Sequence, residues 1–129
     1  MIENYRSFTV DDLFGRTWRI EFAWQQTAIS IRHADAVDVK WRLSTQDEST
    51  EKVLALPHPL LQAASEEFHH PLTDPWCMKL AASHLKQMIE TWQDMDKTLV
   101  TLSREELQLA AEEVSGWEAA RREAAFESQ

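Results

Sequence analysis

Cysteine and glycine are scarce in this 129-residue chain, and each shortage excludes a class of protein. A single cysteine, Cys77, rules out a disulfide within the chain and favours a reducing compartment. Two glycines, Gly15 and Gly116, are too few for a GxGxxG or Walker loop, so these nucleotide-binding motifs are excluded. No apolar run approaches the roughly 18 residues of a membrane helix. The first residues also lack the basic and apolar regions of a signal peptide, so we expect a cytoplasmic protein.

Basic residues are also in short supply. The chain has 13 Lys and Arg against 22 Asp and Glu, which gives a net charge of −9. Nucleic acid and anionic lipid repel such a chain on average. The charge is distributed unevenly along the chain, because residues 15–43 are mildly basic whereas residues 102–129 are strongly acidic. The charge therefore disfavours nucleic acid as a partner, and no membrane association is expected. The surplus of aromatic residues is the reason to expect a protein partner or a homodimer.

The hydrophobic period changes at Pro57-His58-Pro59. Before this point apolar residues recur at every second position, and after it at every third or fourth. A period of two is typical of a strand with one face on a core, and a period near 3.6 is typical of a helix. The change predicts a single α+β domain over 1–129, with 1–56 mainly strands and 57–129 mainly helices. Its expected architecture is an antiparallel sheet of three or four strands, followed by three helices packed on one face.

Local signals set the expected boundaries of these elements. Capping residues and Gly15 suggest a one-turn helix over 7–15. Strands are expected at about 16–24, 27–33, 37–43 and 53–56, and helices at about 59–68 and 75–97. A third helix begins at Ser103-Arg104-Glu105-Glu106, where the serine and the last glutamate form a capping box.

A group of metal-ligand residue types follows the change of period. His69, His70, Cys77 and His84 fall close together in the sequence, and a thiolate with imidazoles could hold zinc. Their spacing matches no standard zinc pattern, and burial of Cys77 as a small apolar residue is the competing interpretation. Cys77 also lies in the first turn of an expected helix, where the helix dipole would lower its pKa and favour a nucleophile. No glycine-rich turn accompanies it, and no cofactor is predicted.

The outward face of the predicted sheet gathers basic residues. If the apolar set of each strand points inward, then Arg19, Arg32, Lys40 and Arg42 point outward together. Such a face could contact an acidic partner or phosphates. No aromatic side chain is expected beside them to stack on a base. The competing interpretation is a solvated face whose opposite charges pair across the strands.

Six tryptophans are many for a chain of this length. We expect most of them to fill the core, since aromatic side chains bury large apolar areas. Trp76 lies at the start of one expected helix and Trp117 lies beside Gly116 in another, and of the six these two are the ones expected to be left outside the core. Burial of both is the competing interpretation. Exposed tryptophans mark interfaces, so these two are candidate partner contacts.

These features together predict a small, acidic, cytoplasmic interaction or regulatory protein without catalytic activity. Two alternatives stay open. One is a metal-dependent or cysteine enzyme that uses the Cys77/His cluster, and the other is a nucleic-acid binder that uses the basic outer sheet face.

Overall fold

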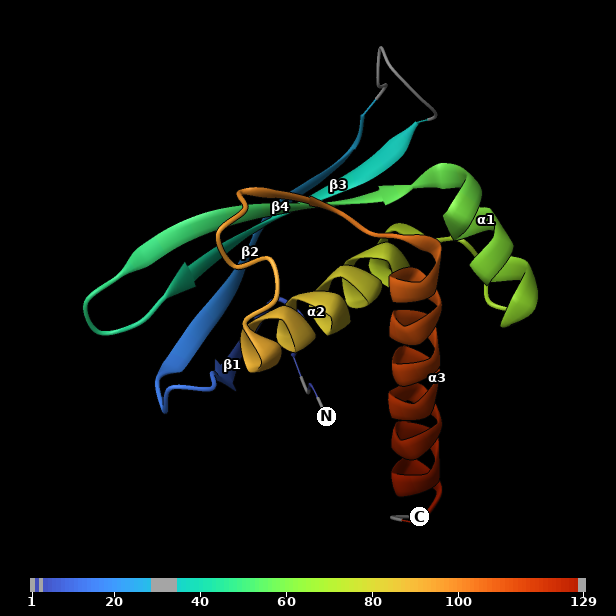
Figure 1. The fold of residues 1–129 in the computed structure, drawn as a ribbon. Helices are drawn as coiled ribbons and strands as arrows, with labels where there is room; N and C mark the ends of the chain where they lie inside the picture. Colours follow the sequence, from blue (N-terminus) through green and yellow to red (C-terminus); the bar gives the residue numbers. More distant parts are fainter. Residues whose placement is uncertain (1, 3, 29–34, 128–129) are drawn as a thin grey trace.

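A five-stranded sheet forms the frame of the molecule (Figure 1). The computed structural model describes residues 2, 4–28 and 35–127. The α+β class is confirmed, but the sheet has five strands of mixed orientation where three or four antiparallel strands were expected. Strands β1 (Ser7–Asp11), β2 (Thr17–Ala28), β3 (Ala36–Ser44) and β4 (Ser49–Pro57) form an antiparallel meander, and β5 (Leu99–Thr101) joins β4 in parallel.

The expected one-turn helix over 7–15 is wrong, because this segment forms β1 and a tight turn into β2. The Asp12 carboxylate, which could have capped a helix, accepts hydrogen bonds from the backbone N–H groups of Phe14 and Arg16 and closes the turn. Gly15 adopts a φ of +82°. Its left-handed conformation therefore serves the hairpin turn and not a helix end.

β2 is one long strand where two were expected, because the chain continues as a strand through residues 25–26. Residues 29–33 of the expected second strand lie outside the described residues. The pairing of β2 with β3 shifts between Phe22 and Trp24, which marks a bulge. Such a shift sends the following side chains to the opposite face. Trp24 therefore pairs with Lys40 on the outer face and is 37% exposed, although its alternation with Phe22 predicts the core.

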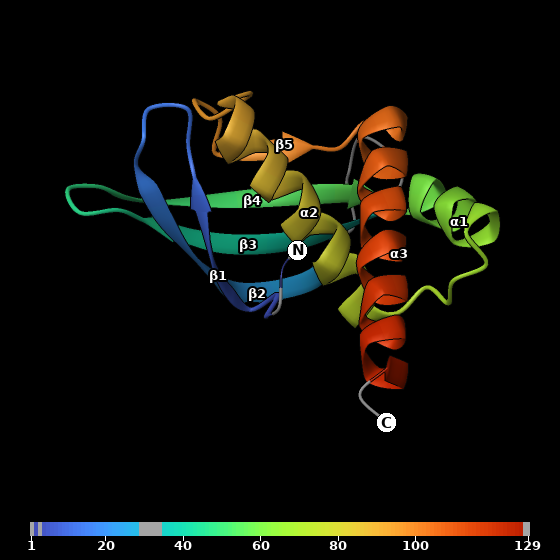
Figure 2. The ribbon, with the colours of Figure 1, turned by 90° about the horizontal axis from the view of Figure 1, so that it is seen from below.

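Three helices complete the fold on one side of the sheet (Figure 2). α2 (Asp74–Thr91) lies on the sheet, α3 (Arg104–Glu127) packs on α2, and α1 (His58–Glu67) follows β4 and contacts α3. α2 ends before the expected Lys97, because Trp92 adopts a left-handed φ of +61°. The predicted capping box is confirmed, since Ser103 and Glu106 each donate a backbone N–H to the side chain of the other.

The core lies between the sheet and α2. Trp18 of β2, Trp41 of β3 and Trp76 of α2 are each at most 2% exposed. Leu107 and Val114 of α3 extend the same core beyond α2. The expectation that Trp76 is left outside the core is therefore wrong. Within the described part of the chain, no helix is long and apolar enough to cross a bilayer.

Candidate functional site at the hairpin end

Cys77 lies in the first turn of α2 and is 2% exposed. Burial, with a smaller contribution from the Asp74 carboxylate, raises the pKa of its thiol to about 11. Desolvation therefore outweighs the helix dipole, which acts in the opposite direction. At neutral pH the sulfur is an enclosed, protonated thiol, and this geometry does not support the cysteine-enzyme alternative.

The histidines of the expected metal cluster are held in separate contacts. His84 is buried, with its Nε2 atom 3.5 Å from a carboxylate oxygen of Glu106 on α3. The Nε2 atom of His70 lies 3.3 Å from Glu118, and His69 is exposed in the loop after α1. Within residues 2, 4–28 and 35–127, no three His, Cys, Asp or Glu side chains are grouped so that they could hold a metal ion.

The outer sheet face carries charges that pair with one another. Arg19 lies 3.3 Å from Glu21. Lys40 and Arg42 lie 3.2 Å and 3.9 Å from the same carboxylate oxygen of Glu51. A cation that is already matched by a carboxylate attracts phosphate weakly, so these pairs favour the solvated-face interpretation over a nucleic-acid surface.

Two further features of this face differ from the expectation. Arg32, the remaining basic candidate, lies outside the described residues. The bulge in β2 also brings an aromatic ring to the face, since the Nζ atom of Lys40 lies 5.8 Å from the ring centre of Trp24. The candidate partner contact at Trp117 is half-buried, with its ring 6.0 Å from that of Tyr5, and Trp76 stacks on His70 inside the fold.

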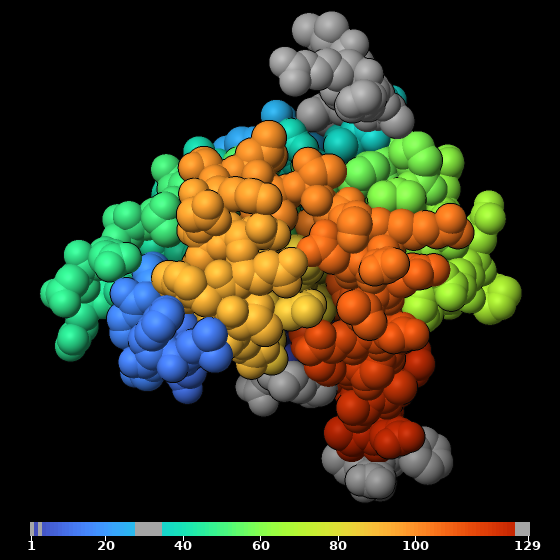
Figure 3. All heavy atoms as spheres, viewed as in Figure 1, coloured from blue at the N-terminus to red at the C-terminus, as the bar shows by residue number. Residues whose placement is uncertain are grey.

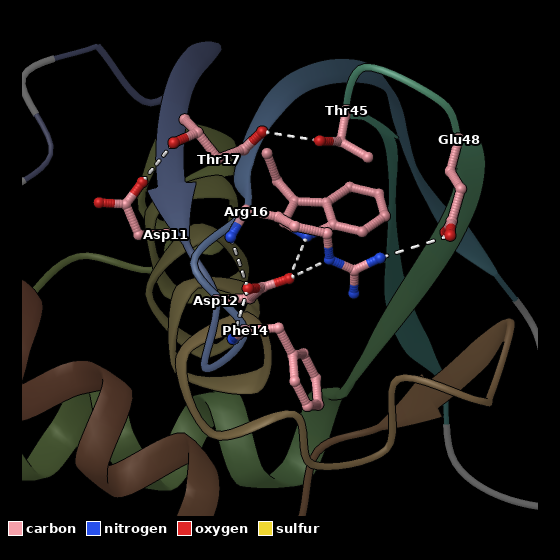
Figure 4. A network of polar contacts seen from close by, with 8 residues as sticks. Asp11, Asp12, Phe14, Arg16, Thr17, Thr45 and Glu48 are labelled. Atoms are coloured by element: carbon pink, nitrogen blue, oxygen red, sulfur yellow. Dashed lines mark hydrogen bonds and ion pairs between the residues drawn. The ribbon is translucent and has the colours of Figure 1, made fainter.

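The β1–β2 turn is fixed by one carboxylate (Figure 4). Asp12 accepts hydrogen bonds from the backbone N–H groups of Phe14 and Arg16, from Arg16 Nε at 2.8 Å and from Trp18 Nε1 at 2.9 Å. Burial alone would raise the pKa of the Asp12 carboxyl, but these hydrogen bonds outweigh it and lower the pKa to about 2. Asp12 is therefore ionised at neutral pH and holds the turn in a single geometry.

The Arg16 guanidinium lies among aromatic rings. It is 5.5 Å from the ring centre of Phe14, 5.2 Å from that of Trp18 and 5.0 Å from that of Trp92. Its Nη1 atom lies 3.4 Å from Glu48 in the β3–β4 turn. Cation–π contacts and an ion pair thus join the two turns to the end of α2.

Two apolar side chains project from this framework. Leu13 and Phe14 are each 64% exposed, and the Phe14 ring meets the half-buried Trp92 edge to face at 5.3 Å. Figure 3 shows the β1–β2 turn, in blue, beside the gold C-terminal end of α2 on one face of the molecule. We refer to Leu13, Phe14, Arg16 and Trp92 as the hairpin-end surface.

A half-open hollow of about 450 Å³ lies near the start of α2. Phe22, Val37 and Met78 contribute apolar lining, and Arg6 and Asp74 contribute charge. The bulged segment of β2 contributes to the lining, since Phe22 and Trp24 on either side of the register shift both border the hollow. The described lining residues include one carboxylate and one guanidinium but no histidine or cysteine. An apolar lining with one charged group of each sign is suited to binding.

Sequence reasoning missed the hairpin-end surface for a local reason. The acids and the glycine at 11–15 are as typical of a one-turn helix, with acids at its start and glycine at its end, as of a turn between two strands. The alternation of Phe14, Arg16 and Trp18 was an available signal, because alternate residues of an extended chain share a side. Trp92 comes from a distant segment, and nothing local indicates its approach. The chain matches no protein-family model, no curated protein and no solved structure.

Proposed function

We propose that this chain is a small cytoplasmic interaction protein that binds a protein partner through its hairpin-end surface and regulates it without a catalytic step. The observation that carries the proposal is the presentation of Leu13 and Phe14. Each is 64% exposed at a turn that the Asp12 hydrogen bonds hold in place. Binding through an ordered turn requires little further loss of conformational entropy, which favours affinity.

The composition of the surface fits a protein interface. Aromatic and arginine side chains are the residues that most often contribute large binding energies. Phe14, Arg16 and Trp92 meet this description within one cluster. Because the rings and the guanidinium already contact one another, a partner would dock on a formed surface.

Charge indicates the kind of partner. Asp11 is exposed at the end of β1, and Asp47 and Glu48 are exposed in the β3–β4 turn that contacts Arg16. The whole chain carries a net charge of −9. The guanidinium of Arg16 is matched by Asp12 and Glu48. The complementary partner is a protein with an apolar pocket bordered by lysine or arginine, and complementary charge of this kind accelerates association at low salt.

Other observations support a non-catalytic role and a reducing compartment. The Cys77 thiol is buried and protonated, which removes the best nucleophile of the enzyme alternative. The described residues that line the hollow beside α2 include no histidine or cysteine. An unpaired, buried thiol is also the state that the cytosol preserves.

The proposal is tested with partners captured from the native host on the immobilised chain, each purified and its affinity remeasured. The double substitution Leu13→Ser with Phe14→Ser removes both projecting side chains. We expect a loss of about 2 kcal/mol or more, which is roughly thirtyfold in affinity. Raising the salt concentration should weaken the wild-type complex.

The matched control is Leu109→Ser, which changes a leucine that is 53% exposed on α3, away from the hairpin end. It should leave the affinity unchanged, and unfolding in urea should show that both variants are folded. A purified partner that binds the double variant as tightly as the wild type would contradict the proposal.

A further inference from the structure

β1 is an edge strand of the sheet, with β2 as its neighbour on one side. The Phe22 N–H donates to the Arg6 carbonyl at 2.8 Å, and the Asp12 N–H donates to the Arg16 carbonyl at 2.9 Å. Both bonds lie in the β1–β2 register, in which even-numbered β1 residues exchange hydrogen bonds with β2. The N–H and C=O groups of the odd-numbered residues therefore face away from β2.

The odd-numbered residues of β1 are accessible. Ser7, Thr9 and Asp11 are all exposed. The Ser7 N–H donates to the Asn4 carbonyl at 3.3 Å. Within the described part of the chain, no group forms a hydrogen bond with the outward-facing N–H and C=O groups of Thr9 and Asp11. Such a row of unpaired groups is a template for another strand.

The charges along β1 suit an antiparallel copy of itself. Arg6 lies before the strand, and Asp11 and Asp12 lie at its end. Arg6 rests over the Phe22 ring at 5.1 Å and forms no ion pair within the described residues. An antiparallel pair centred on Thr9 places each Arg6 near the end of β1 of the other copy, where the Asp11 carboxylate is exposed and accepts a hydrogen bond from Thr17 Oγ1. A parallel pair would instead place like charges together, which destabilises neighbouring strands.

The same register matches the side chains. Ser7 of one copy lies opposite Asp11 of the other on the outer face, where the hydroxyl can donate to the carboxylate. Phe8 lies opposite Val10 on the inner face, and the half-buried Phe8 would be covered further. The two Thr9 residues face each other on the two-fold axis.

We propose that this chain forms a symmetric homodimer through β1, in which the two sheets join into one. Each Thr9 N–H donates to the Thr9 carbonyl of the other copy, and each Asp11 N–H donates to the Ser7 carbonyl of the other copy. The same surface patch serves both copies, as in most two-fold dimers. The opposite edge is less suited, because β5 has only three residues. This dimer is independent of the hairpin-end surface.

Sedimentation of the full chain over a series of concentrations tests the dimer. The wild type should change from monomer to dimer as its concentration rises. Thr9→Lys places two ammonium groups opposite each other and should abolish the dimer. Thr9→Pro removes a donor that only the second copy uses and should do the same. Thr101→Lys, at an exposed position on the β5 edge, should leave the dimer intact.

Amide hydrogen exchange gives a direct readout of the interface. Exchange at Thr9 and Asp11 should slow as the concentration of the wild type rises, while exchange elsewhere on the surface stays constant. The Leu13→Ser and Phe14→Ser double variant should still dimerise, which separates this proposal from partner binding. A wild type that stays monomeric at its highest concentration, or a folded Thr9→Lys variant that still dimerises, would overturn the proposal.

Discussion

Asp12 combines burial, charge and four hydrogen bonds in one side chain. Its pKa of about 2 in the folded chain lies below the usual value near 3.8. The carboxylate therefore stabilises the fold fully above about pH 4, and this contribution is lost as the pH falls toward 2. Asp12→Asn should lower the urea midpoint at pH 7. The difference from the wild type should shrink as the pH is lowered through that window.

The matched control for this prediction is Asp47→Asn, at an exposed acid in the neighbouring β3–β4 turn. Its urea midpoint should stay close to that of the wild type at every pH. If Asp12→Asn shows a difference from the wild type that does not change between pH 4 and pH 2, the low pKa of Asp12 is wrong.

His84 is buried and lacks a hydrogen-bond partner on either ring nitrogen within the described chain. Burial lowers its pKa, although the nearby Glu106 and Asp94 carboxylates act in the opposite direction. A histidine whose pKa is lowered by folding binds its proton more readily when unfolded. The wild type should therefore lose stability as the pH falls below about 6.5, and keep it above that value.

The substitution that tests this is His84→Leu. It should be at least as stable as the wild type at pH 7, because it removes a polar group whose burial without a partner costs about 1–3 kcal/mol. Its stability should not show the decline below pH 6.5. His69→Asn, at an exposed histidine with a φ of +50°, is the control and should keep the decline. Parallel pH profiles of the wild type and His84→Leu would exclude a role for His84.

At the scale of the elements, Lys52 ties the segment after α2 to the sheet. It is 3% exposed, and its Nζ atom donates to the carbonyl oxygens of Met95 at 2.8 Å and Lys97 at 2.5 Å. Hydrogen bonds from a charged donor contribute about 1.5–3 kcal/mol each. Lys52→Met should therefore destabilise the fold by about 2 kcal/mol or more in urea unfolding.

Hydrogen exchange should localise the effect of Lys52→Met. The Val53 N–H, which donates to the Thr98 carbonyl at 2.8 Å, should exchange faster, because the segment that carries its acceptor loosens. The control is Lys86→Met, which removes a lysine that pairs with Glu90 on the surface of α2. Equal exchange at Val53 in the two variants would show that Lys52 does not hold this segment.

The elements differ in how far the sequence could predict them. The start of α3 follows from a capping box, a signal contained within residues 103–106, and it forms as expected. β5 has only three residues, and its pairing with β4 depends on the chain returning across the sheet. The bulge in β2 is also not predicted by local sequence, because the alternation of apolar and polar residues continues through Trp24. Local signals predict local structure, and these two features are set by tertiary packing.

The same distinction applies to the candidate site. The basic outer face was predictable from alternation, and Arg19, Lys40 and Arg42 do lie there. Arg19 pairs with Glu21 of its own strand, whereas the pairing of Lys40 and Arg42 with Glu51 depends on the register between β3 and β4, which local sequence signals do not specify. The raised pKa of the Cys77 thiol could not be predicted from its place in a helix, because burial has the largest effect on that pKa.

At the scale of the whole molecule, one core joins the strands to the helices. Trp41 of β3, Trp76 of α2 and Leu107 of α3 belong to the same buried cluster, and β5 returns the chain to the sheet between α2 and α3. We therefore predict a single cooperative unit, although the two halves of the chain differ in secondary structure. In mild denaturant, the slowest amides of β3 and α3 should exchange with the same free energy of opening.

Cutting the chain at the change of hydrophobic period also tests whether the two halves form a single cooperative unit. Residues 1–57 alone would expose the inner faces of Trp18 and Trp41 that α2 covers in the whole chain. We expect this fragment to be unfolded, because a four-stranded sheet with an uncovered apolar face lacks a second layer. Mixing it with residues 58–129 should restore the circular dichroism of the intact chain if both contribute to one core. A fragment 1–57 that shows cooperative urea unfolding by itself would divide the chain into two units.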